Sequence, residues 1–233
     1  MSKPNWMIDE LAHVGDEHLD VDYVAGYDRK SQTDHSDDLE MLRERGLNAG
    51  SVVVDLGAGT GTFALAVAPH CNQVVAADIS PAMLMYMRLQ IEREGLSNVD
   101  TVHAGLLTYE HEGAAPDFVY SRNTFHHLPD FWKMIAFRRV ADLLAPGGVF
   151  LMHDLVYSFE PGETEAVFER WLSGTVENPD EGYTREDLET HIREECSTFS
   201  WLLEPMLERA GFEIEEIRHR PSRTYSAYIC RKH

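Results

Sequence analysis

The chain has 233 residues, 43% of them hydrophobic, which is enough for one α/β domain with a sizeable core. It carries 40 acidic and 20 basic residues, a formal net charge of −20, so its surface should repel the phosphate backbone of nucleic acids. Three scattered cysteines do not suit a disulfide framework or a zinc site, and we see neither a membrane-length apolar run nor a secretory signal, so we expect a cytoplasmic protein.

Short apolar runs alternate with longer amphipathic stretches, a pattern typical of a parallel sheet with crossover helices. Residues 5–48 precede this pattern and suggest short acidic helices without an apolar stripe. The expected strands then cover residues 51–56, 73–78, 98–103, 117–121 and 149–154. The expected helices cover residues 60–69, 80–95 and 130–145.

The pattern changes after residue 155. Residues 161–210 suggest helices, with breaks near Asn178 and Thr184, and two alternating stretches at 212–218 and 223–231 suggest terminal strands. We therefore expect one domain in four parts: an N-terminal helical segment, a ligand-binding core, a helical insertion or lid, and terminal strands, over residues 1–48, 49–155, 156–210 and 211–233.

A glycine-rich turn follows the first expected strand. Residues 55–61 read Asp-Leu-Gly-Ala-Gly-Thr-Gly, with the acid two positions before the first glycine. A dinucleotide fingerprint would need its third glycine at Thr62. Closely spaced glycines let a ligand approach the backbone, and the amides that begin the next helix suit a carboxylate.

This motif resembles motif I of the class I S-adenosylmethionine (SAM) dependent methyltransferases, and Asp78 at the end of the second strand agrees with that resemblance. The resemblance spans roughly residues 45–155. It implies a Rossmann-like α/β fold: seven strands, mostly parallel with an antiparallel last strand, helices on both faces, and a helical cap. It also implies SAM as cofactor and S-adenosylhomocysteine as product.

The resemblance implies roles for several residues. Asp55 would help hold the amino-acid end of SAM, and Asp78 would accept hydrogen bonds from the ribose hydroxyls. Many family members carry an acid after Gly105 that binds the adenine amine, but here Leu106 removes that contact and leaves backbone groups to read the adenine. The expected cofactor site comprises Asp55, Gly57, Ala58, Gly59, Gly61, Asp78, Ile79, Met83, Gly105, Leu106, Leu107, Ser121, Arg122, Asn123 and Tyr27.

Some of these assignments have structural alternatives. Ile79 and Met83 could contact adenine or belong to the core. Tyr23, Tyr27 or Lys30 could cover the methionine chain or the sulfonium, or could lie on a plain amphipathic helix. In the later insertion, four aromatic residues could line a lid or pack its core: Trp171, Tyr183, Phe199 and Trp201.

Residues 117–130 resemble the motif IV region of small-molecule methyltransferases, where chemistry occurs at the carboxyl ends of strands. The catalytic candidates are His126, His127, His153 and Asp154, and Tyr157 lies near the same strand end. Either histidine of the 126–127 pair could instead be a packing residue. Their spacing matches no metal-ligand signature, so we expect no metal.

The expected reaction is direct displacement, in which an acceptor O, N, C or S atom attacks the SAM methyl group. Alignment of the acceptor atom with the methyl group would supply much of the rate enhancement. A base is needed only if the nucleophile must lose a proton. We expect a small-molecule acceptor, no nucleic acid partner and no membrane span, and leave a homodimer open. The alternatives are a non-catalytic SAM-binding regulator and a nicotinamide-dependent oxidoreductase.

Overall fold

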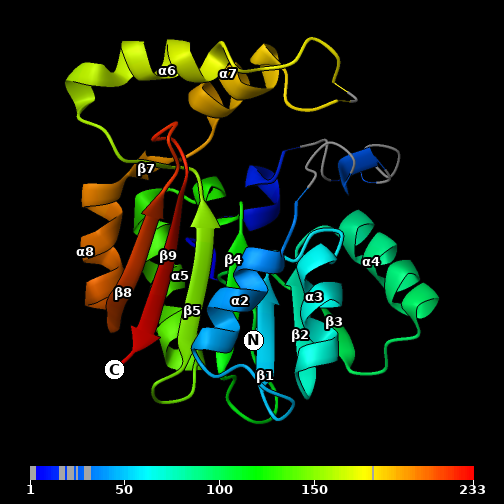
Figure 1. The fold of residues 1–233 in the computed structure, drawn as a ribbon. Coiled ribbons are helices and arrows are strands. Elements are labelled where there is room, and N and C mark those ends of the chain that lie inside the picture. Colours follow the sequence, from blue (N-terminus) through cyan, green and yellow to red (C-terminus); the bar gives the residue numbers. More distant parts are fainter. Residues whose placement is uncertain (1–3, 16–18, 20–23, 25, 29–32, 180) are drawn as a thin grey trace.

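The computed structural model describes residues 4–15, 19, 24, 26–28, 33–179 and 181–233. Its centre is a seven-stranded sheet in the order β3-β2-β1-β4-β5-β9-β8 (Figure 1). The strands are β1 Val52–Leu56, β2 Gln73–Asp78, β3 Val99–His103, β4 Phe118–Arg122, β5 Val149–Asp154, β8 Phe212–His219 and β9 Ser226–Lys232. Strand β9 is antiparallel to β5 and β8, and the other pairs of neighbouring strands in this sheet are parallel, which confirms the expected fold class.

Helices cover both faces of the sheet, so β1 is buried along its whole length. Successive residues of β1 point to opposite faces of the sheet: Val53 packs in one core cluster and Val54 in the other. The first cluster receives α2 Ser36–Glu44, α3 Thr62–Val67 and α4 Pro81–Glu94, and the second receives α5 Asp130–Leu143 and α8 Ser200–Ala210.

Local signals fix the ends of α4, as the sequence predicts. The Ser80 side chain accepts a hydrogen bond from the Met83 amide (3.2 Å), and Pro81 occupies the first helical turn. Gly95 ends the helix in the left-handed conformation (φ 67°). These caps hold the start of α4 next to the carboxyl end of β2.

The strand order places a crevice beside the glycine turn. Strand β1 pairs with β2 on one side and with β4 on the other, so the chain direction along the sheet reverses at β1. Ligands of open α/β sheets bind at the carboxyl ends of strands where this reversal occurs. The loops after β1 and β4 therefore border the same crevice.

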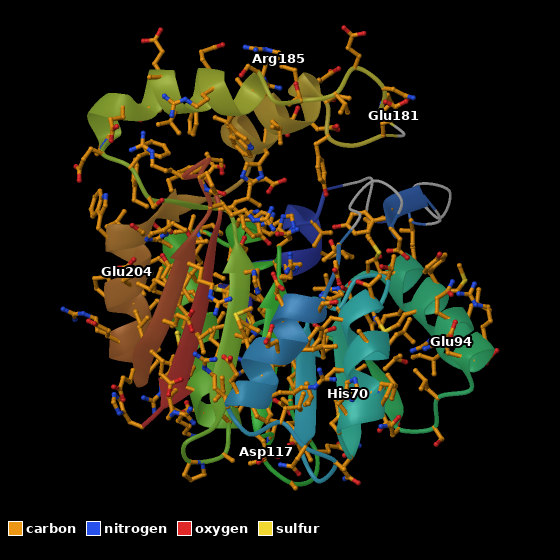
Figure 2. The ribbon with its side chains drawn as sticks, viewed as in Figure 1. His70, Glu94, Asp117, Glu181, Arg185 and Glu204 are labelled. Atoms are coloured by element: carbon orange, nitrogen blue, oxygen red, sulfur yellow. The ribbon has the colours of Figure 1, made fainter. Side chains whose placement is uncertain are left out.

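A separate layer lies over the carboxyl ends of the parallel strands (Figure 1). It contains η5 Pro161–Glu163, α6 Thr164–Leu172 and α7 Arg185–Glu194, and it starts and ends at a two-stranded parallel pair, β6 Val156–Tyr157 and β7 Thr198–Phe199. We call residues 158–197 the cap. Figure 2 shows Arg185 in this layer and Glu204 on α8, beside the sheet. Helix α8 packs in the core, so the cap is shorter than the insertion expected over 156–210.

The N-terminal segment contributes η1 Glu10–His13 and α2. The expectation that this segment lacks an apolar stripe is wrong for α2, because Met41 and Leu42 are buried against the sheet. Their two positions in a short acidic helix are too few to give a clear period. Among the described helices, none is long and apolar enough to cross a bilayer.

Candidate active site

A cavity of about 1410 Å³ lies at the carboxyl ends of the strands, with the cap along one side. It collects residues from the turn after β1, the ends of β2 and β3, the loop after β4, the end of β5 and the cap. The predicted residues that line it are Gly57, Gly59, Asp78, Ile79, Met83, Gly105, Leu106, Arg122, Asn123, Tyr27, His126, His127 and His153, and, from the insertion, Trp171 and Tyr183.

The glycine turn presents open backbone to this cavity. The amides of Gly57 and Ala58 both donate to the Ala77 carbonyl (2.8 and 3.0 Å), which ties the turn to β2. Gly59 adopts the left-handed conformation (φ 55°), and no atom lies within 4 Å of the position that a Cβ would take. The turn thus leaves room for a ligand to lie against Gly59.

Asp78 is fixed at the edge of the cavity by two backbone amides. Its Oδ2 accepts from Gly59 (2.8 Å) and its Oδ1 from Ser80 (2.7 Å). Burial raises the pKa of Asp78, and the amide hydrogen bonds oppose that shift. Each carboxylate oxygen can accept a second hydrogen bond, so Asp78 can bind a ligand with two neighbouring hydroxyls.

Two buried oxygen atoms near the turn have no hydrogen-bond partner among the described residues: Asp55 Oδ2 and Asn123 Oδ1. Burial raises the pKa of Asp55 well above its usual value, and the charges of Asp78 and Asp38 raise it further. Asn123 has a positive φ of 54°, which is uncommon for a residue other than glycine. Unpaired buried acceptors and unusual backbone conformations are features of ligand sites.

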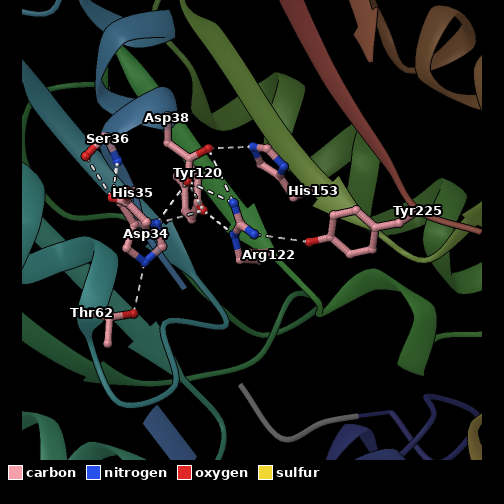
Figure 3. A network of polar contacts seen from close by, with 9 residues as sticks. All are labelled: Asp34, His35, Ser36, Asp38, Thr62, Tyr120, Arg122, His153 and Tyr225. Carbon is pink, nitrogen blue, oxygen red and sulfur yellow. Dashed lines mark hydrogen bonds and ion pairs between the residues drawn. The ribbon is translucent and has the colours of Figure 1, made fainter. Parts of the chain in front are cut away.

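Asp38 of α2 is the centre of a polar network at the cavity wall (Figure 3). Its Oδ2 lies 2.9 Å from His35 Nδ1, 2.8 Å from the Tyr120 hydroxyl and 3.0 Å from Arg122 Nη2. Its Oδ1 lies 2.8 Å from His153 Nε2. Asp38 is only 1% exposed, so α2, β4 and β5 are joined by a buried, well-paired carboxylate.

The network shifts the pKa values of its members in different directions. Burial opposes ionisation of Asp38, but His153, His35 and Arg122 hold its pKa far below the usual range. Burial lowers the pKa of His153, and the positive charge of Arg122 adds to that effect although Asp38 opposes it. Because the usual histidine pKa is already near 6.5, His153 is mostly neutral at pH 7.

His126 joins the core to the cap. Its Nδ1 lies 2.5 Å from Asp154 Oδ1 and its Nε2 lies 2.9 Å from Glu195 Oε2. The Cys196 amide donates to the His126 carbonyl (2.8 Å). Burial opposes protonation of His126, but the carboxylates of Asp154 and Glu195 raise its pKa to about 9. A histidine that is already protonated at pH 7 is a poor general base, so this geometry favours an ion-pair role.

His127 lies beside this group, with its Nδ1 3.9 Å from Glu195 Oε2. Within the part of the chain that the structure describes, His126, His127 and Glu195 bring ligand atoms within 4.8 Å of one another, a spacing that could hold a metal ion. Glu195 is already paired with His126 and, at 2.7 Å, with His191. The expected absence of a metal stays a prediction.

Several predicted residues lie beneath the cavity and do not line it. The Ser121 hydroxyl donates to the Leu56 carbonyl (2.7 Å), and Leu107 is buried in the core. Asp154 accepts from the Phe125 amide (2.7 Å) and orients His126. The others outside the lining are Asp55, Ala58, Gly61 and Tyr157. Tyr23 and Lys30 lie outside the described residues.

Sequence reasoning missed Glu10, Asp38, Glu195 and Tyr225, all of which line the cavity. Each comes from a segment that carries no motif. Asp38 is one of several acids in α2, and only its burial distinguishes it from its exposed neighbour Asp37. The sequence signal that could have helped is Leu106, which stands where the resemblance implies an acid that binds adenine. The absence of that acid suggests that another acid of the chain, such as Glu10, takes its place.

Comparisons with known proteins indicate a methyltransferase domain. Residues 53–148 match a family model described as a methyltransferase domain. Trans-aconitate 2-methyltransferase of Methylobacterium radiotolerans is 34% identical over 112 residues, which are 47% of this chain and 40% of that protein. Phosphoethanolamine N-methyltransferase 2 of Caenorhabditis elegans is 27% identical over 154 residues, or 65% of this chain and 34% of that protein.

A solved structure has a similar fold. Phosphoethanolamine N-methyltransferase 2 of Haemonchus contortus, in complex with phosphomonomethylethanolamine and S-adenosylhomocysteine, superposes with a TM-score of 0.69 at 16% identity, over 97% of this chain and 60% of that one. Residues 53–148 therefore form a methyltransferase domain that resembles those of the class I SAM-dependent family. The cofactor of this methyltransferase family is SAM. The chain spans about a third to a half of the length of the curated relatives it matches.

Proposed function

We propose that this methyltransferase transfers the methyl group of SAM to a small-molecule acceptor bound between the sheet and the cap. The observation that carries the proposal is the pair of buried carboxyl groups at the glycine turn, Asp55 and Asp78, whose pKa values burial raises. Such groups ionise more readily beside a cation. SAM carries an ammonium and a sulfonium, whereas the pyrophosphate of a nicotinamide cofactor would add negative charge.

The cofactor would lie across the turn with its ribose at Asp78. The unpaired oxygens Asp55 Oδ2 and Asn123 Oδ1 suit the ammonium group, directly or through a water. Ile79 and Met83 would contact one side of the adenine, where the cavity wall is apolar. Gly59 must stay small, because the methionine portion would pass where a Cβ would project.

The rest of the cavity suits the acceptor. Ligand pockets usually enclose about 300–1,000 Å³, so a cavity of about 1410 Å³ has room for two small molecules. Arg220 lies over the Tyr225 ring at 4.8 Å, and both line the cavity. The acceptors named for the two curated relatives, phosphoethanolamine and trans-aconitate, both carry anionic groups. We therefore favour a small anionic acceptor, with Arg220 near its charge.

The chemistry needs little from the protein beyond alignment and a closed site. SAM supplies an activated methyl group, and holding the acceptor atom in line with it provides much of the rate. His153, neutral at pH 7 and lining the cavity, is the best-placed group to accept a proton if the acceptor must lose one.

Ligand binding and turnover test the proposal separately. We expect SAM and S-adenosylhomocysteine to raise the melting temperature and NAD to leave it unchanged. Transfer of labelled methyl from SAM is then measured with a panel that begins with phosphoethanolamine and trans-aconitate. Stabilisation by NAD alone would overturn the cofactor assignment, and SAM binding without transfer to any acceptor would favour a regulatory protein.

A further inference from the structure

The adenine end of the proposed cofactor site lacks its usual acid. Leu106 occupies the position where many relatives place one, and its side chain is 5% exposed and packed in the core. The Leu107 amide, which the sequence left available to read the adenine edge, donates to a side chain instead. Neither side chain offers the acceptor that the adenine amine requires.

A carboxylate reaches the same loop from a distant part of the chain. Glu10, at the start of η1, is 5% exposed, and its Oε1 accepts from the Leu107 amide (3.0 Å). Its Oε2 lies 3.4 Å from the Thr108 hydroxyl. Glu10 also lines the cavity, together with Gly105, Leu106 and Asp78. The carboxylate is therefore fixed on the loop after β3 and borders the cavity.

Gly105 shows how closely Glu10 and this loop fit together. A Cβ on Gly105 would lie 2.5 Å from Glu10 Oε1 and 2.8 Å from Oε2, far inside van der Waals contact. The backbone of Gly105 does not adopt the left-handed conformation, so the glycine is needed for space and not for its φ angle. Glycine at 105 and glutamate at 10 are thus a matched pair.

The position relative to Asp78 fits an adenosine. Strands β2 and β3 are parallel neighbours, and the Ala104 amide donates to the Asp78 carbonyl (3.0 Å), so their ends lie side by side. An adenosine whose ribose binds Asp78 would extend its base along the wall that ends at Gly105 and Glu10. A carboxylate has about four acceptor sites, and the contacts of Glu10 to the loop occupy two of them.

We infer that Glu10 accepts the exocyclic amine of the adenine and so selects a 6-amino purine, an inference that rests on the proposed function. An ionised carboxylate offers only hydrogen-bond acceptors, so it matches the exocyclic 6-amino group of adenine, which has two N–H donors. It mismatches a 6-oxo purine, whose oxygen would face the carboxylate. A buried polar group left unpaired in this way gives strong discrimination between close analogues.

Isothermal titration of S-adenosylhomocysteine and its 6-oxo analogue S-inosylhomocysteine tests this inference. Wild-type protein should bind the 6-amino ligand about tenfold or more tightly than the 6-oxo ligand. Glu10→Gln keeps the shape but adds an amide donor, so it should weaken the 6-amino ligand and bind the 6-oxo ligand equally well or better. Glu110→Gln, an exposed glutamate beyond the same loop, is the matched control and should behave as wild type.

The outcomes separate the inference from the proposed function. Equal weakening of both ligands in Glu10→Gln would mean that Glu10 only holds the N-terminal segment, and would overturn the inference while the SAM site stands. Wild-type protein that does not distinguish the two purines would overturn it even if the variant fails to fold. Failure of wild-type protein to bind S-adenosylhomocysteine would instead overturn the proposed function.

Discussion

The wall of the cavity beneath the proposed cofactor and the wall beneath the proposed acceptor differ in how they are assembled. On the cofactor side, Gly59 and Asp78 lie 19 residues apart at the ends of two adjacent strands, and the Gly59 backbone amide donates to the Asp78 carboxylate. We place the acceptor on the side of β4, β5 and the cap, which includes Arg122 although the sequence assigned that residue to the cofactor. On this side Asp38 and Arg122 lie 84 residues apart, and His126 is joined to Glu195 of the cap. One wall is formed by local backbone geometry and the other by charged side chains from distant segments.

The difference separates two requirements of the site. Backbone amides and glycines keep the same geometry whatever the surrounding side chains are, which suits a cofactor that stays the same across a family. Side-chain networks are buried only because tertiary packing brings them together, so removing one member leaves its buried partners unpaired. Mutations on the cofactor wall should therefore change the affinity for the cofactor. Mutations on the acceptor wall should change the stability of the protein and the pH dependence of that stability.

The largest expected effect is on the acceptor wall, in Asp38→Asn. Removing the charge leaves Arg122 and His153 without their buried carboxylate, and we expect the free energy of unfolding to fall by about 3–5 kcal/mol. Denaturant titration measures this, with Asp37→Asn, an exposed neighbour, as control. Because the pKa of Asp38 is lowered, its contribution to stability is present above pH about 4 and is lost in acid. The free energies of unfolding of the wild type and Asp38→Asn should therefore converge in acid. Equal stability of both variants at pH 7 would contradict the network.

Asp78→Ala should act on the cofactor wall. We expect the affinity for S-adenosylhomocysteine to fall by on the order of tenfold or more, because the acceptor of two hydroxyls is lost. Asp100→Ala, at an exposed position on the neighbouring β3, is the control and should bind normally. Unchanged affinity in Asp78→Ala by isothermal titration would place the ribose elsewhere.

Gly59→Ala tests whether the cofactor lies against the turn. Alanine strains the left-handed backbone at Gly59 (φ 55°) and at Gly95 (φ 67°) alike, and at neither position does a Cβ meet another atom within 4 Å. Both variants should lose about 1 kcal/mol of stability. Only Gly59→Ala should weaken S-adenosylhomocysteine, by several-fold, because its methyl group enters the cavity. Loss of affinity in both variants would show that the effect comes from backbone strain.

The smallest effect should come from Glu195→Gln, which removes one partner of His126. The raised pKa of His126 gives stability that is fully present below pH about 6.5 and is lost as the pH rises through about 9. Without Glu195 that loss should begin at lower pH. The melting temperatures of Glu195→Gln and of Glu194→Gln, which changes an exposed neighbour, are measured between pH 6 and 10. Near pH 8, Glu195→Gln should melt about 2–4 °C below that control. Matching profiles would mean that Asp154 alone sets the pKa.

The sequence predicted those parts of the fold that local patterns specify. The bounds of β2 and β5 were predicted correctly, because each contains four consecutive apolar residues and ends in an acid at the carboxyl edge of the sheet. The end of the cap was predicted at residue 210, beyond its position at residue 197 in the structure. The reason is that α8 has the amphipathic pattern that a lid helix would also have, and only tertiary packing puts it against the sheet.

The site divides in the same way. The glycine turn and Asp78 carry a recognisable spacing, and the structure brings them to one cavity edge. The contact between Glu10 and Leu107 joins positions 97 residues apart. A single glutamate in a short acidic segment has no period, spacing or neighbour that would mark it, so no local rule could identify it.

The pairing of β6 with β7 places the two ends of the cap side by side. The chain leaves the core after Tyr157 and returns before Thr198, and Tyr157 is paired with Phe199. A loop that closes on itself in this way can change in length or sequence while the sheet below keeps its register. A segment of about forty residues taken from a relative could therefore be grafted at this pair, which would exchange the cap's part of the acceptor wall without rebuilding the methyl-donor wall.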